Sequence, residues 1–214
     1  MSKFISSSIG RKVVMALTGF FLITFLIVHL GINLSLFWGA EPFNAASEFM
    51  ATNGVIQVMQ YVLAVGFILH IVLGIKLELQ NRSSRGVKYV VNKPSENSSF
   101  SSRNMIVTGI IVLLFLILHL KDFFVELKFF DKGGFASDYD LVTTLFKNPV
   151  YTVIYVIAFV LLGIHLSHGF QSAFQSTGAN YNKYKKCLKN TGIAFSILIA
   201  VGFSAIALYF SFIN

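Results

Sequence analysis

The chain has 214 residues, of which 55% are hydrophobic and only 12% are charged, and its mean hydropathy is +0.72. Because a soluble domain carries about 25% charged residues, this composition excludes an ordinary soluble protein and indicates contact with lipid. The net charge of +8 lies at the borders of apolar segments, which excludes nucleic acid as a partner, and the single cysteine, Cys187, excludes a disulfide framework, a cysteine zinc site and a covalently attached haem.

Five apolar segments are each long enough to cross a membrane, which takes about 20 residues. They cover about residues 12–38, 54–79, 104–120, 149–174 and 191–213. The predicted fold class is therefore all-α, an integral membrane bundle of five transmembrane helices that forms one domain over residues 1–214. The first apolar run is too long for a cleavable signal peptide, and no internal repeat is evident.

The basic residues predict the orientation of this bundle, because Lys and Arg gather on the cytoplasmic side of membrane proteins. A cytoplasmic N-terminus places 13 of the 17 basic residues inside and the C-terminus outside. The expected location is the inner (cytoplasmic) membrane of a cell, as a multi-pass protein. The basic loops serve either topology alone or the docking of soluble partner subunits on the inner face.

All five histidines fall within the predicted spans, and the first four helices each carry at least one of them: His29, His70, His119, His165 and His168. Ionisable residues inside a membrane are costly and usually functional. These histidines are therefore the first candidates for a functional site.

The depths of four histidines group them into two pairs. His29 and His119 lie 17 and 16 residues into helices that enter from the inner side, whereas His70 and His165 each lie 16 residues into helices that enter from the outer side. At about 1.5 Å per residue, this predicts an outer pair, His29 with His119, and an inner pair, His70 with His165. Two imidazoles at one depth suit the axial positions of a haem iron, so we predict two haems stacked as an electron path across the membrane. Alternatively, the histidines form hydrogen bonds between helices.

Two details of this pattern leave alternatives open. His168 lies three residues after His165, and the better match in depth favours His165 as the ligand, with His168 bonding a haem propionate or completing a hydrogen-bond network. Gly66, Gly74 and Gly169 each lie one turn from a predicted ligand, where glycine permits the close approach of a porphyrin or of another helix.

Carboxylates are placed at the borders of the spans, at Glu78 and Asp122, and none falls in the middle of a span. This argues against an ion-coupled transporter and against a fixed carboxylate relay beside the haems. Motifs of hydrolases and nucleotide-binding proteins are absent from the sequence as well.

Several stretches of the chain resemble the b558-type cytochrome subunit of succinate dehydrogenases and fumarate reductases, a single-chain anchor with five spans and two haems b. The resemblance covers nearly the whole chain. The stretches that carry it are Ser7–Lys12 running into Met15–Gly19, Val28–Leu30 with Asn33 and Leu34, Leu69–Ile71 with Gly74, Gln80–Arg82 with Arg85, and His165–Gln175.

This resemblance implies one haem ligand from each of the first four helices, the fourth standing four residues before a glycine, as His165 precedes Gly169. It also implies two partners on the cytoplasmic face, a flavoprotein subunit with FAD that oxidises succinate and an iron–sulfur subunit that passes electrons to the anchor. The anchor would then deliver electrons to quinone, menaquinone in particular, without itself acting on succinate. Some family members carry a glutamate two residues before the fourth ligand for a transmembrane proton path. Gly163 stands there in this chain, which puts that path in doubt and leaves coupling to the membrane potential.

Polar residues near the span ends supply two further sets of candidates. The expected quinone site, near the outer haem, has as candidates Asn33, Glu48, Gln57 and Gln60. The candidates for binding haem propionates near the inner face are Arg11, Lys76 and Arg82. The alternatives are a capping or packing role for the first set and a purely topological role for the second.

Two other functions remain open from the sequence. A di-haem cytochrome b subunit of another membrane oxidoreductase, such as a hydrogenase or a formate dehydrogenase, would share the histidine pattern and dock a different partner. A structural anchor or small transporter without haem would leave the intramembrane histidines without a role, and such histidines are seldom idle.

Overall fold

The computed structural model describes residues 7–83, 103–178 and 183–212, without the side chain of residue 131, and these residues form helices and turns with no β-strand. Five helical segments are long and apolar enough to cross a membrane: Ser8–Trp38, Gly54–Ser83, Met105–Phe129, Pro149–Ser176 and Lys185–Phe212. The prediction of an all-α bundle with five spans is confirmed.

The first two spans are helix α2, Ser8–Leu34, which continues into a 3₁₀ turn η1, Ser35–Trp38, and helix α4, Gly54–Ser83. α2 begins where the Ser7 hydroxyl accepts a hydrogen bond of 3.0 Å from the backbone N–H of Gly10, an N-cap that satisfies one of the free donors at a helix start. The helix therefore begins four residues before the apolar run, at Ser8 and not at Lys12.

The third span differs most from the prediction, which ended it at residue 120. It consists of α7, Met105–His119, a π-helical turn η2, Leu120–Val125, and α8, Glu126–Phe129. The helix passes through Lys121 and Asp122 because the carboxylate of Asp122 is buried against Tyr155, with the phenol donating a hydrogen bond of 2.9 Å. A charged residue with a buried partner does not end a helix, and the sequence alone did not reveal the partner.

The last two spans are α10, Pro149–Ser176, and α11, Lys185–Phe212. Pro149 begins α10 as expected for a residue without an N–H, and the Asn148 side chain caps the helix through the N–H of Val150 at 3.0 Å. α11 begins six residues earlier than predicted, because its lysine-rich first turns are already helical.

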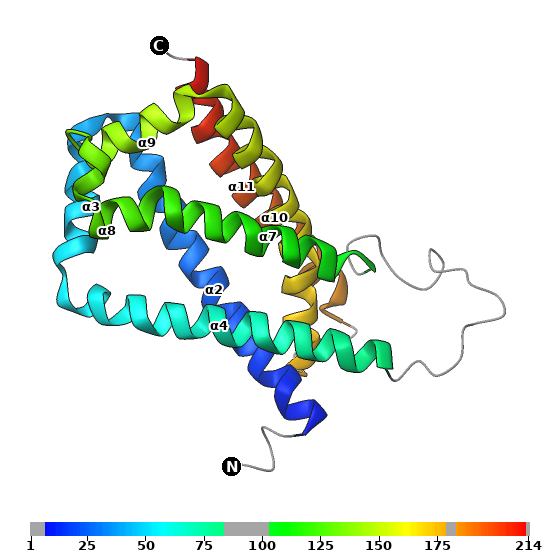
Figure 1. Cartoon of the computed structure of the whole chain (residues 1–214). Coiled ribbons are helices and arrows are strands. Elements are labelled where there is room, and N and C mark those ends of the chain that lie inside the picture. The colour runs from blue at the N-terminus through cyan, green and yellow to red at the C-terminus, as the bar shows by residue number, and fades with distance from the viewer. Residues whose placement is uncertain (1–6, 84–102, 179–182, 213–214) are drawn as a thin grey trace.

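The two sides of the bundle differ in structure. On the side where α2 begins, here the N side, α4 and α10 end and α7 and α11 begin; the opposite side, here the C side, carries two short helices, α3, Ala40–Thr52, and α9, Asp138–Lys147 (Figure 1). Sequence analysis left α3 and α9 as connections. α9 is amphipathic and buries Leu141, Val142 and Phe146, while the Ser137 hydroxyl caps it by accepting from Asp140 N–H at 3.1 Å.

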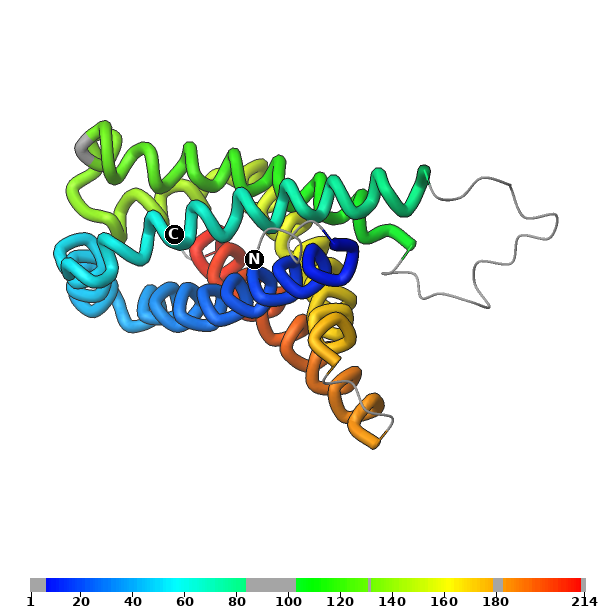
Figure 2. Tube along the Cα trace, turned by 90° about the horizontal axis from the view of Figure 1, so that it is seen from below, coloured from blue at the N-terminus to red at the C-terminus, as the bar shows by residue number. Residues whose placement is uncertain are grey.

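The core of the bundle lies around α10 and α11, which cross the other three long helices obliquely (Figure 2). Together these two helices carry most of the buried side chains, such as Tyr155, Ile199 and Phe203. α4 lies at the edge, since Gly66 is its one buried residue and its apolar side chains face outward, where lipid covers them in a membrane.

Gly163 explains how closely α10 and α11 approach. A Cβ atom on this residue would lie 3.0 Å from the Cβ of Ala200 and 3.2 Å from the backbone oxygen of Ser196. No larger side chain fits at this position unless α11 moves. Gly163, the position at which sequence analysis considered a proton-path glutamate, is thus a helix-packing contact in this chain.

Candidate functional site

Five imidazoles lie inside the bundle, each partly buried, and they fall into two layers. Thr18 on α2 and Thr108 on α7 each lie beside a histidine of one layer, and His29 and His119 on the same two helices form the other layer. Eleven residues separate the two layers along each of these helices. At ~1.5 Å per residue, this is about 16 Å.

The layer near the C side consists of His29 from α2 and His119 from α7. Their ring centroids lie 5.8 Å apart and the ring planes are almost perpendicular, at 87°. For a metal atom between two imidazoles, the centroid separation is the sum of two metal–nitrogen bonds, about 2.0–2.1 Å each, and the two distances from nitrogen to ring centroid. This sum is roughly 6 Å. The pair therefore has the spacing that one iron atom between two imidazoles requires.

Aromatic side chains surround this C-side pair. Phe25 stacks on His29 at 5.2 Å and 17°, and Phe123 lies 5.2 Å from His119. The Nδ1 atom of His119 is buried and has no hydrogen-bond partner among the described residues. A histidine that served to form hydrogen bonds between helices would have a partner at this atom, because a buried polar atom without one is costly, so the enclosure argues against that interpretation of the pair.

The layer toward the N side consists of His70 from α4 and His165 from α10, which lie near each other. The hydroxyl oxygen of Thr18 on α2 lies 3.3 Å from Nδ1 of His70. The hydroxyl oxygen of Thr108 on α7 lies 3.4 Å from Nδ1 of His165. Each histidine of this pair is thus held at the same ring nitrogen by a threonine from a neighbouring helix.

These contacts reveal a short internal repeat that sequence analysis missed. Met-x-x-Thr-Gly occurs in α2 and again in α7, and in both helices a histidine follows eleven residues after the threonine. The partner helices share His-x-x-x-Gly. Its glycines face the repeated methionines: the Cβ position of Gly74 lies 3.3 Å from Cε of Met15, and that of Gly169 lies 3.7 Å from Cε of Met105. The α2–α4 and α7–α10 pairs are therefore built alike.

The three glycines singled out from the sequence lie against side chains of neighbouring helices. A Cβ atom on Gly66 would lie 3.1 Å from the Phe21 ring, and Gly74 and Gly169 face the methionines described above. These contacts favour the helix-packing interpretation of all three.

The C-side pair fits the axial positions of a haem better than it fits a bare metal ion. No group of three or more His, Cys, Asp or Glu side chains able to hold a metal ion occurs within residues 7–83, 103–178 and 183–212. A haem iron needs only two protein ligands, because the porphyrin supplies the other four, and neutral imidazole is a suitable axial ligand. The two imidazoles of the C-side pair, at ligand spacing and among phenylalanine rings, meet that requirement.

The remaining N-side candidates lie in the expected region. His168 is partly buried and forms no hydrogen bond with any described residue. Arg82 forms an ion pair of 2.6 Å with Glu78 one turn before it, and the Arg11 guanidinium lies 3.5 Å from the Ser8 hydroxyl. Lys76 is exposed near the end of α4. Their role toward propionates stays a prediction.

The four predicted quinone residues lie toward the C side, where three of them form hydrogen bonds with residues close to them in the sequence. The Asn33 amide donates to the His29 carbonyl at 2.8 Å. Gln57 donates to the Ala51 carbonyl at 2.6 Å, and Gln60 donates to Gln57 at 3.2 Å. Glu48 is exposed. These contacts are consistent with the capping role considered above, and the quinone role stays a prediction.

A second polar cluster on the C side was missed because Asp122 was assigned to a span border. Asp122 is 5% exposed, accepts from the Tyr155 phenol, and pairs with Lys121 at 3.3 Å. It borders a cavity of about 320 Å³. The lining residues are Lys121, Asp122, Glu126, Gly133, Phe135, Leu141, Thr144, Leu145, Asn148 and Tyr151.

This cluster also borders the C-side histidine pair. The ring of Tyr155 lies 6.3 Å from that of His119, and the π-helical turn that carries Asp122 begins directly after this histidine. π-helical turns occur frequently at functional sites. That turn is the local feature that rotates a carboxylate into the bundle.

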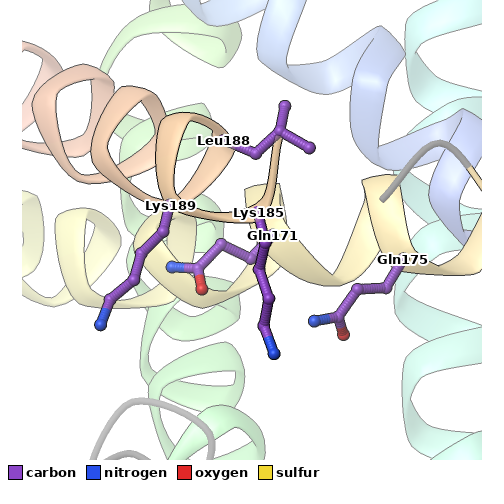
Figure 3. Close-up of a pocket in the computed structure, with 5 residues that line it drawn as sticks. All are labelled: Gln171, Gln175, Lys185, Leu188 and Lys189. Atoms are coloured by element: carbon purple, nitrogen blue, oxygen red, sulfur yellow. The ribbon is translucent and has the colours of Figure 1, made fainter. Parts of the chain in front are cut away.

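A smaller pocket of about 40 Å³ lies on the N side, between the end of α10 and the start of α11. Figure 3 shows the Gln171 amide between the side chains of Lys185 and Lys189. Its volume suits a few water molecules. The pocket belongs to the basic N-side surface and holds no buried charged group.

One known protein with a similar sequence agrees with this description. The chain is 24% identical over 190 residues to the succinate dehydrogenase cytochrome b558 subunit of Bacillus subtilis strain 168, and the match covers 88% of this chain and 89% of that protein. No protein-family model matches the chain, and no solved structure matches it. The similarity is distant, and it extends over almost all of both chains.

Proposed function

We propose that this chain is the membrane anchor of a succinate:quinone oxidoreductase and that it binds two haems b, one between His29 and His119 and one between His70 and His165. The observation that carries the proposal is the C-side pair, two partly buried imidazoles from different helices whose ring centroids lie 5.8 Å apart. The distant similarity to a succinate dehydrogenase cytochrome b558 subunit supports the same function.

The chain's own residues account for much of what such a site needs. α2 and α7 position one pair of histidines, and α4 and α10 position the other, about 16 Å away along the helices. Phe25, Phe123 and Phe203 exclude water from the C-side pair. A bound haem supplies reversible one-electron transfer, and two of them in this arrangement make an electron path between the two sides.

The N side is the face on which we place the soluble partners, a flavoprotein subunit with FAD and an iron–sulfur subunit. Lys185, Lys186 and Lys189 are exposed there at the start of α11, and Lys76 and Arg82 lie at the end of α4. A surface of this charge attracts acidic partner surfaces. With the positive-inside rule, it also supports a cytoplasmic N side in the inner membrane.

The C-side cavity beside Asp122 is our preferred site for the quinone headgroup, menaquinone in particular. Its volume falls within the range of about 300–1,000 Å³ that is usual for ligand pockets. Lys121, Asn148 and Tyr151 line it with hydrogen-bond donors suited to quinone carbonyls. The carboxylate of Asp122 is a proton acceptor beside the C-side histidine pair. The site expected around Asn33, Glu48, Gln57 and Gln60 is the competing assignment on the same side.

The experiment that tests this function is purification of the tagged chain from its native membrane. We expect a flavoprotein with FAD and an iron–sulfur protein to accompany it, with succinate:quinone activity that depends on the chain. Partners with hydrogenase or formate dehydrogenase activity would instead support the competing di-haem function. A chain that purifies alone under conditions that preserve such complexes would contradict both.

A further inference from the structure

Thr18 and Thr108 occupy equivalent places in the two halves of the bundle, and each contacts Nδ1 of a histidine in the N-side pair. We propose that these threonines are positioning residues: they hold the rings of His70 and His165 in the tautomer that carries its proton on Nδ1. Nε2 is then left unprotonated and able to bind iron. The inference rests on the proposed function only for the identity of the metal group.

The tautomer follows from the single proton of each hydroxyl. A threonine hydroxyl has one donor and two acceptor lone pairs. The Thr18 hydroxyl donates to the Met15 carbonyl at 2.9 Å, and the Thr108 hydroxyl lies 3.0 Å from the Met105 carbonyl and 3.1 Å from the Asn104 carbonyl. These carbonyl contacts are shorter than the contacts with the imidazoles, at 3.3 and 3.4 Å, so we assign the hydroxyl proton to the carbonyl and the hydroxyl oxygen as the acceptor for the ring. An Nδ1–H that donates to this oxygen is the form that binds a metal through Nε2.

The residue after each threonine leaves room for the ring. A Cβ atom on Gly19 would lie 3.6 Å from Cε1 of His70, and one on Gly109 would lie 3.3 Å from Cε1 of His165. The imidazole thus rests on the bare backbone of the neighbouring helix, with the hydroxyl at its Nδ1 atom. The same Thr-Gly pair makes both contacts in both halves, which a chance hydrogen bond would not explain.

The C-side pair lacks this support. Nδ1 of His119 has no hydrogen-bond partner among the described residues, and phenylalanine rings contact both histidines of that pair. Hydrogen bonds to the distal nitrogen of a ligand histidine raise its basicity and fix its orientation. The two haems are therefore expected to differ in midpoint potential. The ligands of the N-side pair are the more basic ones, and they stabilise the oxidised iron more than the C-side ligands do.

The test is a redox titration of the two haems in the full chain, with Thr18→Val and Thr108→Val. We expect each valine variant to raise one of the two midpoint potentials, or to release haem from one site, and to leave the other haem unchanged. Serine keeps the hydroxyl, so Thr18→Ser and Thr108→Ser are expected to behave like the unaltered protein. The matched control is Thr24→Val, because Thr24 is on the same helix as Thr18 and, among the described residues, its hydroxyl bonds only to the Phe20 carbonyl, at 3.0 Å.

Three results would overturn the proposal: unchanged potentials with two haems retained in both valine variants, an equal change in Thr24→Val, or haem loss that serine does not restore. Thr18→Ala and Thr108→Ala replace any valine variant that fails to fold. A colourless unaltered chain would refute the proposed function instead. In that case nitrogen-15 NMR of the histidine rings still tests the tautomer, since Nδ1–H signals of His70 and His165 must be present in the unaltered chain and lost in the valine variants.

Discussion

The phenol of Tyr155 donates a hydrogen bond of 2.9 Å to the carboxylate of Asp122, and both residues are buried, with 1% of Tyr155 and 5% of Asp122 exposed. The pair joins α10 to the π-helical turn that follows His119. It places a carboxylate inside the third span, beside the C-side histidine pair. Sequence analysis expected no carboxylate relay near the haems, and this pair is the feature that revises that expectation.

Tyr155→Phe removes the buried donor from Asp122. Because hydrogen bonds to a charged group contribute about 1.5–3 kcal/mol, we expect the free energy of unfolding in detergent to fall by roughly that amount. Tyr209→Phe is the control, since the Tyr209 phenol forms no hydrogen bond with the described residues while its ring packs on Phe37. Equal stability of the two variants would show that the Tyr155 hydroxyl does not stabilise the fold.

Asp122→Asn tests the quinone pocket. We expect succinate:quinone activity of the assembled complex to fall at least tenfold, because the proton acceptor is lost, while reduction of a soluble dye by the flavoprotein subunit stays unchanged. Glu48→Gln serves as the comparison, because Glu48 is exposed on the same side and belongs to the competing assignment. A greater loss in the Glu48 variant would move the quinone site away from the cavity.

His165→Ala and His168→Ala decide the fourth haem ligand. The Thr108 hydroxyl lies against Nδ1 of His165, and no described residue bonds to His168. We expect one haem per chain in the first variant and two in the second, measured as haem per polypeptide after purification. The reverse result would exchange the roles of the two histidines.

Gly163→Ala tests the packing of α10 against α11. The added methyl group would lie 3.0 Å from the Cβ of Ala200, so we expect a loss of about 1–3 kcal/mol in unfolding free energy. Gly31→Ala is the control, because nothing lies within 4 Å of its Cβ position and alanine is favoured over glycine in a helix by about 1 kcal/mol. If the Gly163 variant is as stable as the Gly31 variant, α11 can shift to accommodate the methyl group at little cost, and the close contact at Gly163 does not stabilise the fold.

The five spans were predictable because a long apolar run has few alternatives to a membrane helix. The pairing of His29 with His119 was also accessible, since helical rise converts residue counts into depth and their ring centroids lie 5.8 Å apart. The role of the four histidines as haem ligands stays a prediction. Both predictions use only properties of one helix at a time.

What the sequence did not reveal depends on contacts between helices. Asp122 reads as a border charge unless Tyr155, thirty-three residues later, is known to face it. The Met-x-x-Thr-Gly repeat is too short to attract notice until each threonine is seen against a histidine of another helix. α9 was missed because it is short and its sequence contains charges of both signs.

The central claim of two haems held by four histidines is tested most directly by a reduced-minus-oxidised visible spectrum of the purified chain, with haem quantified per polypeptide. We predict two b-type haems per chain with low-spin, bis-histidine bands. A colourless protein, purified under conditions that retain haem, would contradict the account.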